Sequence, residues 1–333
     1  PAPESAADVA AVAESDTPAR VKPSVALEAK HHLGFMREVV LSPDGKAALS
    51  LDRHGEVRLW PAYEEGTVPF ALPVAEPLWM SLAATKTGYL AAFIDTSGGA
   101  HVATIDVTDG AARWTTAFDV PPTDPMFELH VLEGGQRILA LGVDHRLRLW
   151  DAEGTTLAEL DEHGVIPWQL RVEHDGTRTH AAAVQFSPVR IQRLQVGDDG
   201  LKLVGEPQPL AIDQSPNRND IGMSPDGRYA TAMQKPKPKE GRFEIEVVDL
   251  HDGTRRMLVA ESDTKFRPRV HPRTDAVIAE TGSGAAMKLP LEQAVPWQPG
   301  ADRDALVPIQ AQMLSYAGSN DLSMVHTTVR GGV

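Results

Sequence analysis

Four residues in the N-terminal part of the chain could act together chemically: His32, Ser50, Asp52 and Trp60. An imidazole, a hydroxyl and a carboxylate are the groups with which hydrolases activate a serine nucleophile, so a catalytic interpretation must be weighed. The other interpretation is structural, because buried polar side chains also satisfy one another and fix the packing of the chain without any reaction. The choice depends on the elements that carry these residues.

No other catalytic or metal-binding signature accompanies them. The remaining histidines are scattered without an HExxH pair, and the sequence contains no cysteine, so nothing in it supports a zinc site. Gly282-Ser283-Gly284 lies in a hairpin pattern with no helix behind it, unlike the nucleophile elbow of serine hydrolases. No glycine-rich phosphate loop precedes a helix. We therefore expect no catalytic residue, no cofactor and no metal, and a protein that is not an enzyme.

Alternating Lys and Pro residues in Gln234–Gly241 form a candidate contact segment. This alternation disfavours helix and sheet pairing, so Lys235, Lys237 and Lys239 are expected on an extended, exposed hairpin of an otherwise acidic body. The segment is either an arm that contacts an acidic partner or anionic headgroups, or a solvated loop insertion.

Proline followed by aromatic or large apolar residues forms a second candidate surface. These pairs lie just before or within expected strands: Pro69-Phe70, Pro77-Leu78-Trp79-Met80, Pro125-Met126-Phe127, Pro167-Trp168 and Pro296-Trp297. Exposed aromatic and Met side chains are favoured at contact surfaces, whereas buried ones pack one structural unit on the next. We expect one or two of the six tryptophans to be partly exposed.

A small β-unit recurs along the chain and supplies these elements. Its anchor is a Ser-Pro-Asp-Gly turn between two apolar strands, in which Pro sets φ and Gly takes a positive φ. Seven intact or degenerate anchors lie roughly 41 to 51 residues apart, the period of a four-stranded propeller blade: Ser42–Gly45, Thr85–Gly88, Glu133–Gly135, Glu173–Gly176, Ser224–Gly227, His271–Thr274 and Ser315–Gly318. The strands that follow alternate apolar and polar residues, which is typical of half-buried β-structure.

Two stretches resemble a known family. His32-Leu33-Gly34 through Ser42–Gly45 to Asp52 and Trp60 looks like a WD40 repeat, and Gly142–Asp151 resembles the end of one, including the Trp-Asp pair. The Ser-Pro-Asp-Gly turns are equally similar to those of bacterial TolB-type propellers. The resemblance covers roughly residues 25–333 and implies a structural hydrogen-bond network of His32, Ser50, Asp52 and Trp60, with Asp144 and Trp150 in the third blade.

The expected fold is therefore all-β: a single seven-bladed β-propeller of four-stranded blades at 23–333, with six or eight blades as alternatives. Pro23–Glu28 is placed to close the ring as the outer strand of the last blade, which would remove two sheet edges. Leu306–Met313 and Leu322–Val329 are expected as strands of the seventh blade. Residues 1–22, rich in Ala, Pro and acidic residues, are expected to be a flexible leader or tether.

Composition narrows the choice of function. A net charge of −14 and a pI near 5.3 argue against nucleic-acid binding. No run of about eighteen apolar residues could form a membrane helix. The leader suggests a spacer after a signal peptide, lipid anchor or membrane helix, or a linker from a preceding domain. We expect a non-catalytic interaction scaffold, a periplasmic or otherwise extracytoplasmic subunit of a membrane-associated bacterial complex, with a cytoplasmic location as the alternative. The alternative function is an enzyme or ligand-binding propeller with its site in the central channel.

Overall fold

The computed structural model describes residues 24–30, 36–62, 67–160, 167–175, 178–185, 188–197, 200–212, 220–233, 242–261, 269–273, 275–280, 285–296 and 312–316. Regular structure in these residues is β-strand, apart from two short 3-10 turns, η1 (Glu133–Gly135) and η2 (Leu291–Gln293). Across this part of the chain, no helix has the length and hydropathy to cross a membrane.

The strands of the described residues form six antiparallel sheets, which we number as blades one to six in chain order. Blade one contains β2 (Met36–Leu41), β3 (Ala48–Asp52), β4 (Glu56–Trp60) and β5 (Phe70–Ala75). Blade two contains β6 (Trp79–Ala84), β7 (Gly88–Ile94), β8 (Ala100–Thr108) and β9 (Ala111–Val120). Blade three contains β10 (Met126–Val131), β11 (Arg137–Gly142), β12 (Leu147–Asp151) and β13 (Thr156–Leu160).

The remaining sheets repeat this order. Blade four contains β14 (Pro167–His174), β15 (Thr179–Gln185), β16 (Arg190–Gly197) and β17 (Gly200–Pro209). Blade five contains β18 (Ile221–Met223), β19 (Tyr229–Met233), β20 (Arg242–Asp249) and β21 (Arg255–Glu261), with β25 (Val295–Pro296) added at its edge. Blade six contains β22 (Arg269–Pro272), β23 (Ala276–Glu280), β24 (Ala285–Pro290) and β26 (Gln312–Tyr316).

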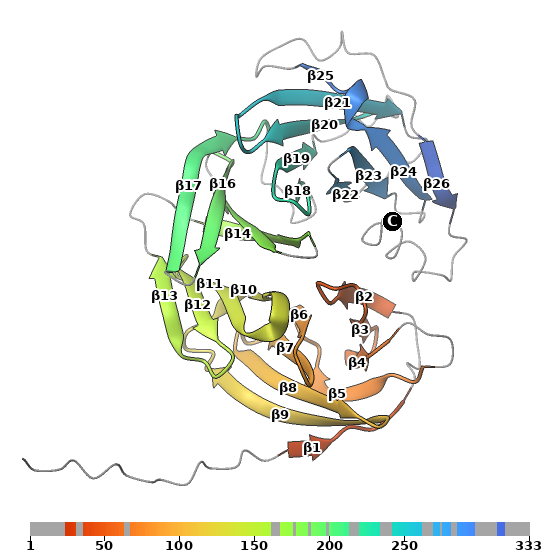
Figure 1. The fold of residues 1–333 in the computed structure, drawn as a ribbon, viewed down its shortest axis with the longest axis vertical. Coiled ribbons are helices and arrows are strands. Elements are labelled where there is room, and N and C mark those ends of the chain that lie inside the picture. The colour runs from red at the N-terminus through yellow and green to blue at the C-terminus, as the bar shows by residue number, and fades with distance from the viewer. Residues whose placement is uncertain are drawn as a thin grey trace, which may run out of the picture.

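Consecutive blades stand side by side around a ring, with the first strand of each nearest the centre (Figure 1). Each first strand contacts the first strand of the next blade, from β2 and β6 through to β18 and β22. This arrangement confirms the all-β propeller of four-stranded blades. The count of seven stays a prediction: the expected strand Leu306–Met313 overlaps β26, which completes blade six, and Leu322–Val329 lies outside the described residues.

The expected closing strand was assigned to the wrong blade. Within Pro23–Glu28, β1 (Ser24–Ala26) pairs with β9 and becomes a fifth strand of blade two, with Ser24 opposite Thr115 and Ala26 opposite Arg113. The ten-residue β9 presents a long outer edge whose backbone groups would otherwise lack strand partners. An adjacent edge can satisfy the N-terminal strand as well as the last blade could, which is why sequence alone did not distinguish them.

Apolar side chains fill the space between neighbouring blades. Leu59 of blade one and Phe93 of blade two share one buried cluster, and Ile94 and Trp150 share the next, between blades two and three. Corresponding clusters join blades three and four, four and five, and five and six. Burial between copies of the unit is the main force that holds a repeat array together.

Polar side chains also connect the first strands. Ser81 Oγ on β6 accepts a hydrogen bond from Val131 N on β10 at 2.8 Å. The buried Glu128 carboxyl on β10 accepts one from Leu170 N on β14 at 3.0 Å, and Arg171 Nε on β14 donates to Ile221 O on β18 at 2.6 Å. Polar groups in the centre of the ring thus find partners in the next blade, which fixes the blades relative to one another.

Candidate functional site

The strand order of the blades defines two faces of the ring. In an antiparallel sheet, the first strand starts at the end where the second strand finishes and the third begins. We call this the top face, and the opposite one, with the turns between first and second and between third and fourth strands, the bottom face. The candidate site lies on the top face of blades two and three.

Aspartates build the top-face turns. Asp52 Oδ1 accepts the backbone N–H groups of His54 at 2.8 Å and Glu56 at 3.0 Å in blade one. Asp95 accepts those of Ser97 and Gly99 in blade two, and Asp144 that of Arg146 in blade three. Such side-chain acceptors close tight turns, so the three aspartates first have a structural role.

Backbone hydrogen bonds tie these turns to the chain between blades. Met126 N donates to Gly98 O at 3.0 Å, and Val143 N donates to Pro125 O at 2.9 Å. His145 Nδ1 lies 3.0 Å from Pro167 O, just where β14 begins. The top faces of blades two, three and four therefore form one continuous, internally bonded frame.

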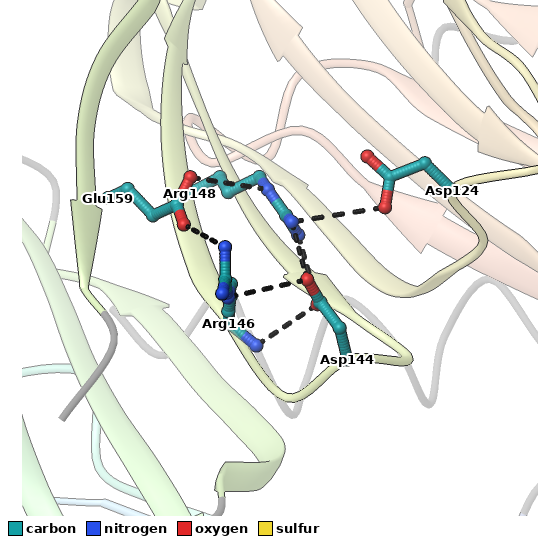
Figure 2. Close-up of polar contacts among 5 residues, drawn as sticks. All are labelled: Asp124, Asp144, Arg146, Arg148 and Glu159. Atoms are coloured by element: carbon teal, nitrogen blue, oxygen red, sulfur yellow. Dashed lines mark hydrogen bonds and ion pairs between the residues drawn. The ribbon is translucent and has the colours of Figure 1, made fainter. Parts of the chain in front are cut away.

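Figure 2 shows an ion network on this frame. Arg148 lies with its guanidinium against Asp144, at 3.1 Å and 2.5 Å, and within 3.8 Å of Asp124 from the link between blades. Arg146 binds Glu159 Oε1 at 2.9 Å. The hydrogen bond from Arg148 lowers the pKa of Asp144, and the same bond raises the pKa of Arg148. Both groups therefore stay charged over the physiological range.

An imidazole occupies the matching place in blade two. His101 Nδ1 lies 2.8 Å from Asp119 Oδ1, and its Nε2 lies 3.0 Å from Asp95 Oδ2. Burial alone would lower the pKa of His101, but the hydrogen bonds to Asp95 and Asp119 outweigh it and the pKa is raised. Burial would likewise raise the pKa of Asp95, but hydrogen bonds from Ser97, His101 and the backbone lower it to about 2.

This histidine is poorly arranged for base catalysis. Ser97 Oγ donates to Asp95 at 2.6 Å rather than to an imidazole nitrogen, and both ring nitrogens of His101 are held by carboxylates. A general base needs a free nitrogen directed at the nucleophile. The hydrogen bonds of His101 with Asp95 and Asp119 therefore hold the blade-two turn in place.

Large apolar side chains are exposed beside these charges. Leu78 is 58% exposed, and Phe127 and Val143 are each 39% exposed. Phe127 is the extra residue of a β-bulge at the start of β10, because Met126 and Glu128 pair with the adjacent residues Gly142 and Leu141. A bulge turns a side chain away from its usual direction, and here the side chain is left exposed. Trp168 occupies the same bulge position in β14 and is half-buried.

Sequence reasoning had named part of this surface. Of the proline-linked residues, Leu78, Phe127 and Trp168 lie at the top of first strands, while Phe70 is buried in the outer strand β5 and Trp297 lies outside the described residues. The bulges were missed. The sequence feature that marks each bulge is a polar residue at the third position of the first strand: Glu38, Glu128 and Gln169.

The structure describes every residue of the expected structural network except His32. Trp60 Nε1 donates to Ser50 Oγ at 2.7 Å, and Asp52 is buried in its turn. His32 lies outside the described residues, so its bond to Asp52 stays a prediction. In blade three Asp144 binds arginines and Trp150 packs edge-on against Phe118, with ring centres 5.7 Å apart. The two do not repeat the arrangement of blade one.

The lysine segment also lies outside the described residues, so Lys235, Lys237 and Lys239 stay a predicted contact. The flanking strand ends are described: β19 finishes at Met233 and β20 begins at Arg242, on the top end of blade five. Among the described side chains, no group of three or more His, Asp or Glu could hold a metal ion.

Comparison with known proteins identifies the fold. No protein-family model matches the chain, and no curated relative does. The β-propeller domain of Cps50 (Swd1) from Myceliophteria thermophila is 14% identical over 75% of this chain and 81% of that one, with a TM-score of 0.51. Sqt1 from Saccharomyces cerevisiae is 12% identical over 79% of this chain and 72% of its own, with a TM-score of 0.55. These likenesses show a β-propeller fold, and both the WD40-like and the TolB-type resemblance stay predictions.

Proposed function

We propose that this WD40-like propeller is a non-catalytic scaffold for protein–protein interaction that holds a partner segment on the top face of blades two and three. The observation that carries this proposal is the exposure of Leu78, Phe127 and Val143 on a frame fixed by hydrogen bonds. Exposed apolar side chains on a rigid support contribute most to binding, because little conformational entropy is lost when a partner covers them.

The charges around the apolar residues indicate the chemistry of the partner. Five carboxylates border this surface against two guanidinium groups and one imidazole: Asp95, Asp119, Asp124, Asp144, Glu159, Arg146, Arg148 and His101. The guanidinium of Arg148 is already covered by carboxylates, so the remaining field is negative. A segment with apolar anchors flanked by Lys or Arg would complement it.

Two exposed leucines, Leu78 at the start of blade two and Leu157 in blade three, provide a matched test of the top-face binding surface. We expect Leu78→Asp to abolish copurification of the native partner from membranes, because it places a charge where an apolar anchor is needed. Leu157→Asp is the control: Leu157 is 51% exposed on the outer strand β13, so it makes the same chemical change away from the surface. Partner recovery should be measured by quantitative mass spectrometry.

Phe127→Ala should weaken partner binding by about 2 kcal/mol, as expected for loss of an aromatic anchor. If the partner is recovered equally with Leu78→Asp, Phe127→Ala and wild type, the top face of blades two and three is not the binding surface. Recovery of the wild-type protein only as a free monomer would contradict the scaffold function itself.

We further propose that the scaffold works in a membrane-associated bacterial assembly outside the cytoplasm, in the periplasm. The support is compositional: residues 1–22 are rich in Ala, Pro and acidic residues, as expected of a tether. The absence of cysteine is compatible with this location but does not distinguish it from the cytoplasm. Fractionation of cells that express the untagged protein tests this proposal. Release with the periplasmic fraction or retention with membranes supports it, and recovery in the cytoplasmic fraction contradicts it.

A further inference from the structure

An open hollow of about 880 Å³ lies on the bottom face between blades four and five. Two segments of blade four form one wall of the hollow: Arg178–Ala181, where β15 begins, and Arg193–Val196, near the end of β16. The turns of blade five, Asp226–Arg228 and His251, form the other. With Val204 of β17, five chain segments from two blades line the hollow, at a place that the top-face proposal does not involve.

The two walls are held in close contact. Gly227, at φ +66°, lies so near His180 that an added Cβ would be 2.7 Å from the Cβ of that histidine. His180 Nε2 is held by Asp175 Oδ2 at 3.0 Å. His180 is therefore held between the blade-five turn and Asp175, so this part of the wall is in place before a ligand binds.

Two of the three arginines that line this hollow have no carboxylate partner among the described residues. Within the described residues, the exposed guanidinium of Arg178 makes no ion pair, and Arg193 Nε is buried without a hydrogen-bond partner. By contrast, the guanidinium groups of Arg58, Arg148 and Arg255 each bind a carboxylate. An incoming carboxylate would therefore not have to displace an existing carboxylate partner from Arg178 or Arg193.

The carboxylates of the hollow are already engaged. Asp226 Oδ1 accepts from Ser224 Oγ at 2.5 Å and from Arg228 N at 3.1 Å. Asp249 Oδ2 accepts from Arg228 Nε at 2.9 Å. These groups hold the turn of blade five and do not reach Arg178 or Arg193 among the contacts that the structure describes. Three arginines and one aspartate line the hollow, so its lining has an excess of cationic side chains on a protein of charge −14.

We propose that this hollow binds an acidic peptide segment of a protein partner. An enclosed apolar cavity would suit a small molecule, whereas this hollow is open and combines guanidinium groups with the aliphatic wall of Leu194, Val196 and Val204. Arginine clusters recognise strings of carboxylates through forked hydrogen bonds. An extended segment with at least two Asp or Glu side chains can reach Arg178 and Arg193 together.

A fluorescein-labelled octaglutamate peptide tests the proposal by fluorescence anisotropy with the full chain at low salt. We expect saturable binding that weakens as salt is added, and a loss of affinity of about tenfold for each of Arg178→Gln and Arg193→Gln. Arg193→Lys keeps the charge but not the fork, so it should lose affinity by a smaller factor. Thermal unfolding of each variant verifies that it is folded.

Arg190→Gln is the matched control, because Arg190 lies exposed on the same strand β16 but at its top end. An equal loss of affinity with Arg190→Gln would show that only overall charge matters and would overturn the proposal. Binding of inorganic pyrophosphate without binding of octaglutamate would overturn the assignment to an acidic peptide. Both results are independent of the top-face variants, so this proposal and the proposed function can fail separately.

Discussion

Two glycines with the same local sequence give a sharp test of how the blades contact one another. Gly45 and Gly227 each end a Ser-Pro-Asp-Gly turn, with φ of +68° and +66°. Gly45 belongs to blade one, where an added Cβ would meet no heavy atom within 4 Å. At Gly227 the same atom would lie 2.7, 2.8 and 2.9 Å from Cβ, Nδ1 and Cγ of His180.

Substitution by alanine therefore has one cost at Gly45 and two at Gly227. The positive φ costs an L-residue about 1–2 kcal/mol at either position. At Gly227 the new methyl group must also displace His180, whose Cβ is fixed to the backbone and cannot rotate away. Overpacking of this kind costs about 1–3 kcal/mol. We expect Gly227→Ala to lower the free energy of unfolding by about 1–3 kcal/mol more than Gly45→Ala does.

The assay is urea unfolding of wild type and both variants, followed by tryptophan fluorescence. Circular dichroism of the folded variants serves as the control that neither has lost its sheet structure. Equal destabilisation by the two substitutions would refute the reasoning, because the contact between the blade-five turn and His180 would then carry no constraint. A larger effect at Gly45 would refute it as well.

Three further substitutions test polar contacts. His101→Gln should destabilise the protein at low pH and lose this effect as the pH rises above about 6.5, the pKa of an unfolded histidine. The reason is that the pKa of folded His101 is raised, so its interactions add stability below the unfolded pKa and lose it as the pH passes the folded pKa. Thermal unfolding over a pH series measures the effect, and a stability difference between variant and wild type that stays constant with pH contradicts it. Glu128→Leu leaves Leu170 N–H without its acceptor and should cost about 1–3 kcal/mol in urea unfolding, with Glu128→Gln costing less. Ser81→Ala removes the acceptor of Val131 N–H and should cost about 1 kcal/mol; no loss at either site would show that water replaces the lost acceptor.

The repeat was predictable because its turns and strands depend on residues that are close together in the sequence. Ser42–Gly45 and Ser224–Gly227 form the expected turns, with Ser Oγ bonded to Asp Oδ1 in both. The alternating strands that follow them pair as expected, and the interior of the ring is filled by their apolar faces. Turn chemistry and alternation depend on a few consecutive residues, so a single sequence is enough to reveal them.

Features that depend on distant residues were not predictable. The partner of β1 is chosen by which outer edge is within reach, and nothing in Ser24–Ala26 distinguishes β9 from another edge. The bottom-face hollow brings Arg178 and Arg193 to a turn of the next blade, about 30 to 50 residues away along the chain. Phe127 was singled out as a proline-linked aromatic, but only the register of β10 shows that a bulge exposes it.

The position of β1 has a consequence for synthesis on the ribosome. Ser24–Ala26 pairs with Arg113–Thr115, and the next residues bind the outer strand of blade one through Lys30 N to Pro69 O and Ala71 N to Glu28 O. The N-terminal segment therefore cannot finish its pairing until β9 has emerged, roughly 5–20 s later at the usual rate of translation. Blade two gains its fifth strand only after blade one has been made, and the N-terminal segment then joins the two blades.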